Sequence, residues 1–270
     1  MRTLQNIVIS LVCMVSGVMA EELINSVGMK FVSIKGGEYM MGYQPRDVNG
    51  CPKDDPFTKK REGGECYFKI LRKNEEYKYS APYHKERVED FYMGVTEVTQ
   101  LQYYKVMRKN PSFFQTDKLK YDSRNNPVED ISFKKARSFV KQLNALEKTT
   151  KYRLPTRAEW EYVAHTGSQS RWSFGNDARA LQEYAWYRKN SARKTHPVAE
   201  KNPNAFGVYD IYGNVTEYVK DAKSGGAVGG GFHSSIDDVS PYWYHVKWTA
   251  QRSGYNISKR YNGLRVVRDK

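Results

Sequence analysis

The C-terminal part of the chain, from Gly167 onward, has few apolar runs with a regular period. Glycine, asparagine, serine and aromatic residues dominate it. Residues of these types favour turns and loops, because glycine and asparagine accept backbone conformations that other residues avoid. We therefore expect short strands and irregular loops over most of this part of the chain.

Three helices in the preceding part carry start signals. Ser132 precedes a run whose apolar residues share one helical face, and the set is Ala136, Phe139, Val140, Leu143 and Leu146. Thr99 and Gln102 form a capping-box pattern, in which each residue bonds the other's backbone N–H. The short helix that follows them is expected to pack through Leu101, Tyr104 and Met107.

The stretch RLPTRAEWEYVAHTG, residues 153–167, contains a third helix start. Thr156 and Glu159 form a capping box directly after Pro155, which predicts a helix on structural grounds alone. The capping box leaves Arg153, before the turn, without an explanation.

Two alternating apolar runs between Met29 and Gly42 flank the turn Lys35–Glu38 and predict a β-hairpin. A further strand is expected from Val88 to Val95. With the helices and the loop-rich C-terminal part, these elements predict the α+β class with much irregular structure.

Residues 1–20 have the pattern of a secretory signal peptide. Arg2 precedes an apolar run from Ile7 to Met19, and small residues end the segment before two glutamates. The run is too short to span a bilayer, so we expect one domain, residues 21–270, exported to the periplasm or outside the cell without a transmembrane anchor. The alternative is a short buried N-terminal helix.

The formal net charge is +14, and loss of Arg2 with the signal would leave +13. This charge suits a protein or an anionic or glycan ligand of the cell envelope, lipid head groups included, but it also keeps soluble proteins dispersed. Lys and Arg are spread along the sequence rather than forming one block. Export argues against nucleic acid as the partner.

Cys51 and Cys66 are the cysteines that remain after Cys13 is removed with the signal. They flank a polar loop with proline and glycine that cannot bury much of itself. In an oxidising compartment this pattern predicts a disulfide, which stabilises such a loop by about 3 kcal/mol. The alternatives are a free reactive pair or a metal site.

The segment from Asn202 to Asp221 sets Asp210, Asn214 and Glu217 among glycines. Carboxylate and amide oxygens around glycine turns are suitable ligands for calcium, which also accepts backbone carbonyls. The spacing is not that of an EF-hand. A glycine-rich turn with side-chain caps explains the same residues.

Taken together, these stretches resemble the formylglycine-generating enzyme (sulfatase-modifying factor) family. The resemblance rests on six motifs in family order: FVSIKGGEYMMG, FYMGVTEVT, NPVEDISFKKARSFVKQLN, YRLPTRAEWEYVAHTG, HPVAEKNPNAFGVYDIYGNVTEYVKD and NGLRVV. It covers Ser26 to Arg268. It implies a compact, loop-rich fold of the C-type-lectin-like kind. It also implies a calcium site at Asp210, the backbone of Gly213 and Val215, and Glu217.

The chain departs from the family where formylglycine-generating members carry a cysteine pair that holds copper and activates oxygen. That chemistry needs soft thiolate ligands. The interval from Gly229 to Arg265 contains no cysteine, and a glycine-rich segment ending in His233 replaces the family's usual motif. We therefore expect neither copper nor oxidation of a sulfatase cysteine.

Other residues of this interval could carry a function. His233 and His245, with Asp237 and Asp238, could form a site for another metal, although their spacing matches no known metal motif. Aromatic faces beside cations could instead bind a ligand. The residues expected to do so are Trp243, Trp248, Arg252, His233 and His245. Packing of a loop-rich core explains the same aromatic residues.

The sequence therefore supports three hypotheses. We favour an exported, non-catalytic or catalytically diverged member of the family that acts as a binding or accessory module in the cell envelope. The second is a metal-dependent oxidoreductase of the same fold that uses ligands other than cysteine. The third is a structural scaffold stabilised by calcium.

Overall fold

The computed structural model describes residues 22–42, 84–168, 170–220, 226–236, 239 and 260–270, and the backbone alone of strands at 58–60, 66–68 and 244–245. The predicted signal peptide and Cys51 lie outside these residues. Only the backbone of Cys66 is described, so the disulfide between Cys51 and Cys66 stays a prediction.

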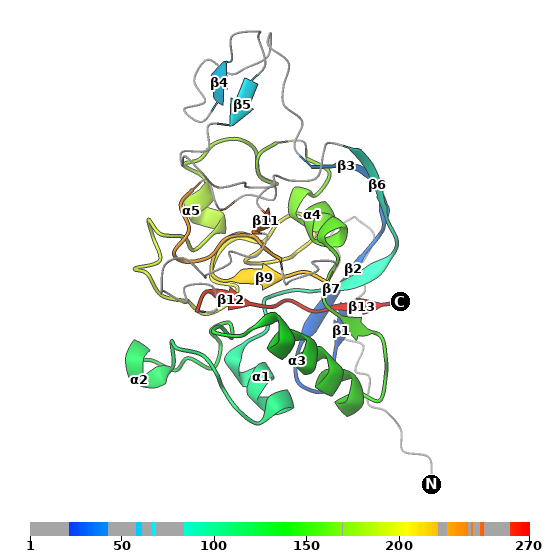
Figure 1. Cartoon of the computed structure of the whole chain (residues 1–270), viewed down its shortest axis with the longest axis vertical. Helices are drawn as coiled ribbons and strands as arrows, with labels where there is room; N and C mark the ends of the chain where they lie inside the picture. The colour runs from blue at the N-terminus through cyan, green and yellow to red at the C-terminus, as the bar shows by residue number, and fades with distance from the viewer. Residues whose placement is uncertain are drawn as a thin grey trace.

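The main sheet joins the two ends of the described chain. Its five strands follow the order β1-β2-β7-β13-β8, and all the pairings are antiparallel. The strands are β1 (Glu22–Ile24), β2 (Lys30–Ile34), β7 (Phe91–Gly94), β13 (Val267–Asp269) and β8 (Tyr152–Arg153). The last strand of the chain, β13, lies between β7 and β8, which places the C-terminus inside the first sheet (Figure 1).

The C-terminal part contributes a second sheet of very short strands, in the order β11-β10-β9-β12. They are β9 (Thr216–Tyr218), β10 (Ala227–Val228), β11 (Tyr244–His245) and β12 (Asn262–Gly263). β12 runs parallel to β9, and the other pairings are antiparallel. The strands have two or three residues each, as the glycine-rich and asparagine-rich sequence predicts.

The predicted hairpin between Met29 and Gly42 is wrong. β2 pairs with β7, whereas β3 (Gly37–Met41) pairs with β6 (His84–Val88) in a separate two-stranded sheet. The chain changes sheet at Gly36, where the N–H donates to Asp90 Oδ1 at 2.9 Å. Gly36 is needed there, because an added Cβ would lie 2.2 Å from the carbonyl oxygen of Val88.

The strand expected from Val88 to Val95 is divided at the same point. β6 ends at Val88 and β7 begins at Phe91, and Asp90 between them binds both the Gly36 N–H and the Lys35 ammonium. The strands on either side of Gly36 therefore pair with the strands on either side of Asp90, and neither segment forms a hairpin of its own. A further two-stranded sheet joins β4 (Thr58–Lys60) and β5 (Cys66–Phe68).

The helix starts were predicted correctly. The described helices are α1 (Gln100–Met107), α2 (Thr116–Leu119), α3 (Phe133–Leu146), α4 (Arg157–His165) and α5 (Leu181–Tyr184). Both capping boxes form, with Thr99 and Thr156 as N-caps, and Ser132 caps α3. Arg153 bonds both carboxylate oxygens of Glu159 at 2.6 Å. The residue that the capping box left unexplained therefore also fixes the helix start.

The predicted packing faces need two corrections. On α1 the buried aromatic residue is Tyr103, which stacks on Phe139 of α3 at 5.1 Å, whereas Tyr104 is 50% exposed. On α3, Ala136, Phe139 and Leu143 are buried as predicted, but Leu146 at the last turn is 48% exposed.

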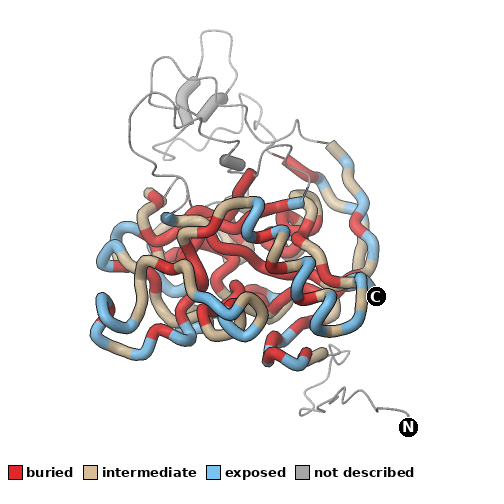
Figure 2. Tube along the Cα trace, turned by 60° about the horizontal axis from the view of Figure 1, so that its bottom comes forward, coloured by how far each residue is buried: buried red, intermediate tan, exposed pale blue. Residues whose placement is uncertain are grey.

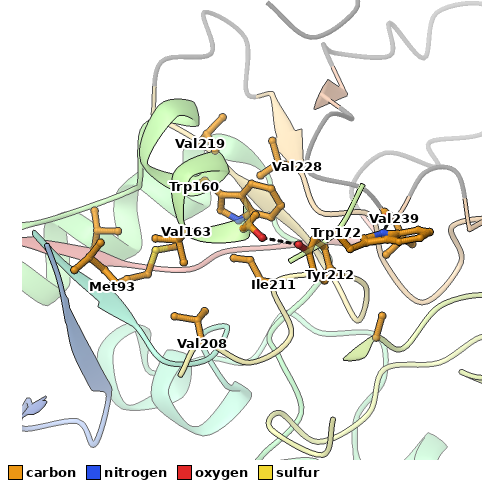
Figure 3. Close-up of a cluster of buried hydrophobic side chains, with 14 of the residues drawn as sticks. Met93, Trp160, Val163, Trp172, Val208, Ile211, Tyr212, Val219, Val228 and Val239 are labelled. Atoms are coloured by element: carbon orange, nitrogen blue, oxygen red, sulfur yellow. Dashed lines mark hydrogen bonds between the residues drawn. The ribbon is translucent and has the colours of Figure 1, made fainter. Parts of the chain in front are cut away.

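Two hydrophobic clusters fill the interior. Figure 2 shows the buried positions gathered in the middle of the described chain. One surrounds α4, and Figure 3 shows Trp160, Trp172 and Tyr212 in it. The other lies beneath α1 and α3 and includes Phe139 and Tyr103. The strands of the main sheet contribute to both clusters, through Met93 to the first and Phe31 to the second.

We predict that Phe139→Ala lowers the free energy of unfolding by about 3–5 kcal/mol, because it removes a fully buried ring from the second cluster. Leu146→Ala, on the same helix, is the matched control. Its half-exposed side chain should contribute no more than about 0.5 kcal/mol. Urea unfolding of the two variants measures both values, and equal losses would contradict the packing described.

Candidate functional site

Of the residues predicted to bind a ligand, the structure describes the side chain of His233. Trp243, Trp248 and Arg252 lie outside the described residues, as do Asp237 and Asp238. His245 is described through its backbone alone, in β11, where it pairs with Ala227 of β10. The structure therefore tests neither the predicted histidine pair nor the predicted aromatic set as a whole.

His233 belongs to an aromatic group built from separate parts of the chain. Its ring stacks on Tyr261 at 3.8 Å between centroids with the planes 19° apart. Phe232 meets Tyr261 edge-on, and its backbone carbonyl accepts a hydrogen bond from Ser191 Oγ. Phe232 is buried, whereas His233 and Tyr261 are only partly covered. The buried residue thus anchors two rings that reach the surface.

The loop between α1 and α2 extends this group. Phe114 packs edge-on against Phe232 at 5.2 Å and against its neighbour Phe113 at 5.1 Å. Two cations lie over the Phe113 ring, Lys118 at 3.5 Å and Arg260 at 3.9 Å. We call this set the aromatic–cation face, made of Phe113, Phe114, Lys118, Phe232, His233, Arg260 and Tyr261.

Glu129 supports the face from within. Its carboxylate Oε1 accepts the Phe114 N–H at 2.7 Å, and its own N–H donates to Ser112 Oγ at 3.2 Å. Burial, with a smaller contribution from Asp130, raises the pKa of Glu129 to about 7. Its Oε2 has no hydrogen-bond partner within the part of the chain that the structure describes. Sequence reasoning missed Glu129, and the available signal was an acidic residue within the apolar run NPVEDISF.

The predicted calcium residues surround a buried ion pair. Arg265 binds the Glu217 carboxylate, with Nη2 2.7 Å from Oε1 and Nε about equally far from both oxygens, at 3.0 and 3.1 Å. The Trp160 indole donates to Glu217 Oε2 at 2.8 Å. Arg265 and Glu217 are 0% and 1% exposed. Since these donors occupy both oxygens of Glu217, a cation would have to share that carboxylate with Arg265.

Asp210 adjoins the same guanidinium. Its carbonyl accepts from Arg265 Nη2 at 3.2 Å, and its Oδ2 accepts the Ala199 N–H at 2.7 Å. Its Oδ1 is buried and has no hydrogen-bond partner among the described residues. Burial raises the pKa of Asp210 to about 6. Of the two predicted carboxylate ligands, Asp210 therefore has the oxygen without a hydrogen-bond partner among the described residues.

A third carboxylate, Glu97, completes the group. It accepts the Val215 N–H at 2.9 Å and the Asn214 amide at 2.8 Å, which holds the loop before β9. Burial, with Asp210 and Glu217 nearby, raises the pKa of Glu97 well above its ordinary value. We call Glu97, Asp210, Glu217 and Arg265 the acid cluster. Sequence reasoning missed Glu97, although its motif FYMGVTEVT was recognised.

Gly213 has a structural role next to this cluster. Its φ is 81°, and an added Cβ would lie 2.3 Å from the Trp186 carbonyl oxygen. Within the part of the chain that the structure describes, no group of three or more His, Cys, Asp or Glu side chains is arranged to hold a metal. The calcium site at Asp210, Gly213, Val215 and Glu217 stays a prediction.

Residues 19–270 match the Sulfatase-modifying factor enzyme 1-like domain. The chain belongs to this family. Chaperone protein LppX from Paenibacillus barcinonensis is 30% identical over 233 residues, which cover 67% of this chain and 81% of that protein. Formylglycine-generating enzyme from Mus musculus is 34% identical over 109 residues, which cover 36% of this chain and 27% of the enzyme. The alignment with this enzyme thus covers about a quarter of its length.

Solved structures confirm the fold of the family. Treponema denticola variable protein 1 superposes with a TM-score of 0.66 at 22% identity, covering 92% of this chain and 97% of that one. PvdO from Pseudomonas aeruginosa gives 0.65 at 19% identity, covering 93% and 98%. The predicted α+β, formylglycine-generating-enzyme-like fold is correct. None of the helices that the structure describes has the length and apolar character needed to cross a membrane.

The raised pKa of Asp210 predicts a stability that depends on pH. Between about pH 4 and pH 6 the folded carboxyl keeps a proton that the unfolded chain has lost, so stability falls as the pH rises through this window. Asp210→Asn cannot ionise, and asparagine accepts the φ of 50°. In chelator, we expect the variant to gain stability over the unmodified protein by a few kcal/mol between pH 4 and pH 7, at about 1.4 kcal/mol per pKa unit.

The control for this prediction is Asp177→Asn. Asp177 is exposed, and its pKa is lowered by Arg179, so it titrates below the same window. Its stability difference from the unmodified protein should stay flat from about pH 5 to pH 7, and a change nearer pH 4 has the opposite sign to that of Asp210. Urea unfolding at each pH measures both differences in the free energy of unfolding. If the difference for Asp210→Asn does not change with pH either, Asp210 does not titrate as described.

Proposed function

We propose that this chain is an exported accessory protein of the cell envelope that binds a partner and does not generate formylglycine. The observation that carries the proposal is the aromatic–cation face, where His233 and Tyr261 present a ring stack next to Arg260 and Lys118. Such a face supports binding rather than a defined reaction, because it offers stacking and cations without an activated nucleophile.

The cysteine content supports the non-catalytic part of the proposal. The family's oxygen chemistry depends on a cysteine pair, and this chain has no cysteine between Gly229 and Arg265. The relative from Paenibacillus barcinonensis bears the name chaperone, and it aligns over more of this chain than the mouse enzyme does. Both facts favour an accessory role.

The chemistry of the face defines the kind of ligand. Flat rings receive apolar or ring surfaces, and the two cations over Phe113 attract negative charge. An acidic polypeptide segment and an acidic glycan both combine these properties. We infer that the ligand belongs to one of these two classes, and the binding experiment below separates them.

We also propose a structural calcium ion at the acid cluster. Three buried carboxylates lie around one guanidinium, which pairs with Glu217. Asp210 Oδ1 has no hydrogen-bond partner in the described ranges, so Arg265 alone does not neutralise the cluster. Asp210, the carbonyls of Gly213 and Val215, and Glu217 would hold the ion. Calcium would neutralise this charge, since it accepts carboxylate and carbonyl oxygens in flexible geometry.

We predict that Tyr261→Ala weakens ligand binding about tenfold, the loss that corresponds to about 1.4 kcal/mol from one aromatic anchor. Tyr261→Phe keeps the ring on His233 and should bind like the unmodified protein. The probes are a reduced, unfolded acidic polypeptide and heparin, measured by calorimetry at one fixed salt concentration for all variants. Preference for one probe identifies the ligand class.

Three results would contradict this proposal. Equal binding by Tyr261→Ala and Tyr261→Phe would remove the aromatic–cation face from the binding site, and so would failure of both probes to bind. Conversion of the cysteine in a sulfatase peptide, detected by mass spectrometry, would contradict the non-catalytic role. Stoichiometric iron or copper in the purified protein would instead support the metal-dependent alternative.

For calcium, we predict that a chelator lowers the melting temperature of the purified protein and that added calcium restores it. Asp210→Asn should lose most of this response, because it removes the charge of the available carboxylate. Magnesium is the control, since it demands octahedral geometry and gives up its water reluctantly. A melting temperature that is the same in calcium and in chelator would rule out the site.

A further inference from the structure

Helices α1 and α3, with the residues that flank them, carry a large share of the positive charge of the chain. Residues 100–110 and 132–151 contain nine Lys and Arg and one acidic residue, Glu147, a balance of +8 out of the formal +14. The cations are Lys105, Arg108, Lys109, Lys134, Lys135, Arg137, Lys141, Lys148 and Lys151. About thirty residues of a 270-residue chain thus hold more than half of its net charge.

The fold brings these two segments together. α1 packs on α3 through the stack of Tyr103 on Phe139, and the two helices lie side by side at one end of the molecule (Figure 1). α3 buries Ala136, Phe139 and Leu143, so Lys134, Arg137 and Lys141, at helical spacing on the other side, point to solvent. Figure 2, turned to bring this end forward, shows the exposed positions along it.

These cations are not neutralised by neighbours. Within the described part of the chain, Lys134, Arg137 and Lys141 form no ion pair, whereas exposed cations elsewhere do, such as Arg124 with Asp122. The one acidic residue of the two segments, Glu147, accepts hydrogen bonds from Ser26 instead. The outer surface of α1 and α3, which we call the basic helix face, therefore attracts negative charge at long range.

A large aromatic side chain is exposed among these cations on α1. Tyr104 is 50% exposed and lies one helical turn before Arg108. Leu146, at the last turn of α3, is 48% exposed but lies on the helical face of Phe139 and Leu143, away from Lys134, Arg137 and Lys141. Single exposed residues are normal on monomeric proteins, but Tyr104 occurs beside cations that form no ion pair with the described residues. This combination is typical of surfaces that lie at a lipid interface, where apolar and aromatic groups enter the head-group region.

The kind of cation separates a bilayer from a protein partner. Seven of the nine cations are lysine and two are arginine. Protein interfaces are enriched in arginine and depleted of lysine, whereas attraction to anionic lipid depends on charge near the surface and works equally with lysine. α3 has 14 residues and is therefore about 21 Å long. This length suits an extended surface rather than a pocket.

We propose that the basic helix face docks this protein on an anionic lipid bilayer. The proposal goes beyond the ligand binding inferred above, because it uses different residues from the aromatic–cation face. Docking would hold the protein at a membrane surface, with α1 and α3 toward the lipid.

The test is co-sedimentation of the purified protein with two kinds of vesicle, phosphatidylcholine alone and phosphatidylcholine mixed with phosphatidylglycerol. We expect binding to the anionic vesicles only, and its loss at high salt. The triple variant Lys134→Gln, Arg137→Gln, Lys141→Gln should bind the anionic vesicles about a hundredfold more weakly, from the contribution expected of three cations at such a surface.

The matched control removes the same charge elsewhere. Arg188→Gln, Lys189→Gln and Arg193→Gln replace three exposed cations in the loop after α5. This variant should bind anionic vesicles within about threefold of the unmodified protein, since the charge near the lipid is unchanged. Equal melting temperatures of the two variants would show that both remain folded.

Several outcomes would overturn the proposal. One is equal binding to both kinds of vesicle, and another is equal weakening by the two triple variants, which would indicate a response to net charge alone. Binding to polyphosphate but not to anionic vesicles would replace the bilayer with a soluble anionic polymer. Tyr261→Ala should bind vesicles normally, so failure of the ligand proposal and failure of the docking proposal give different results.

Discussion

The buried pair of Arg265 and Glu217 connects the parts of this fold that lie far apart in the sequence. Besides Glu217 on β9, the guanidinium binds the carbonyls of Gly94, at the end of β7, and of Tyr209. Trp160 of α4 binds the same carboxylate. Both sheets and the central helix therefore meet at one charge pair. Removal of one partner from such a pair leaves a buried charge, which typically costs about 3–5 kcal/mol. The contacts of the pair join the loop-rich C-terminal part to the first sheet.

The interior around this pair holds three carboxylates, Glu97, Asp210 and Glu217, and one guanidinium, Arg265. Glu97 and Asp210 adjoin the pair, and desolvation raises the pKa of each. Glu97 nevertheless has a structural role, because it accepts the Val215 N–H and the Asn214 amide and so fixes the buried loop before β9. A loop-rich protein needs such side-chain acceptors, since its backbone groups lack the regular partners of helices and long strands. The surplus acid therefore follows from the same need for acceptors. A proton neutralises part of it where burial raises the pKa, and the proposed calcium ion would do the same.

The sequence predicted what depends on residues close together in the chain. Capping boxes at Thr99 and Thr156 need only three residues of spacing, and both form as expected. The hairpin around Gly36 failed because its strands pair with β6 and β7, a choice set by Asp90, more than fifty residues away. The roles of Glu97 and Glu129 were not predicted for the same reason, since each carboxylate binds a loop from another part of the sequence. The charge on α1 and α3 also became visible only when the fold placed the two helices together.

The two proposed binding surfaces also differ in how the fold supports them. The aromatic–cation face is built from loops, and its geometry depends on one buried carboxylate, Glu129, that holds the Phe114 backbone. The basic helix face needs no such support, because two regular helices position their outer residues by period alone. A loop-built face can change its ligand through substitutions that leave the interior intact, whereas a helical charge face requires only that several cations persist. Loss of the cysteine pair in this chain is consistent with the first case, because the family's fold remains although the residues of its chemistry are absent.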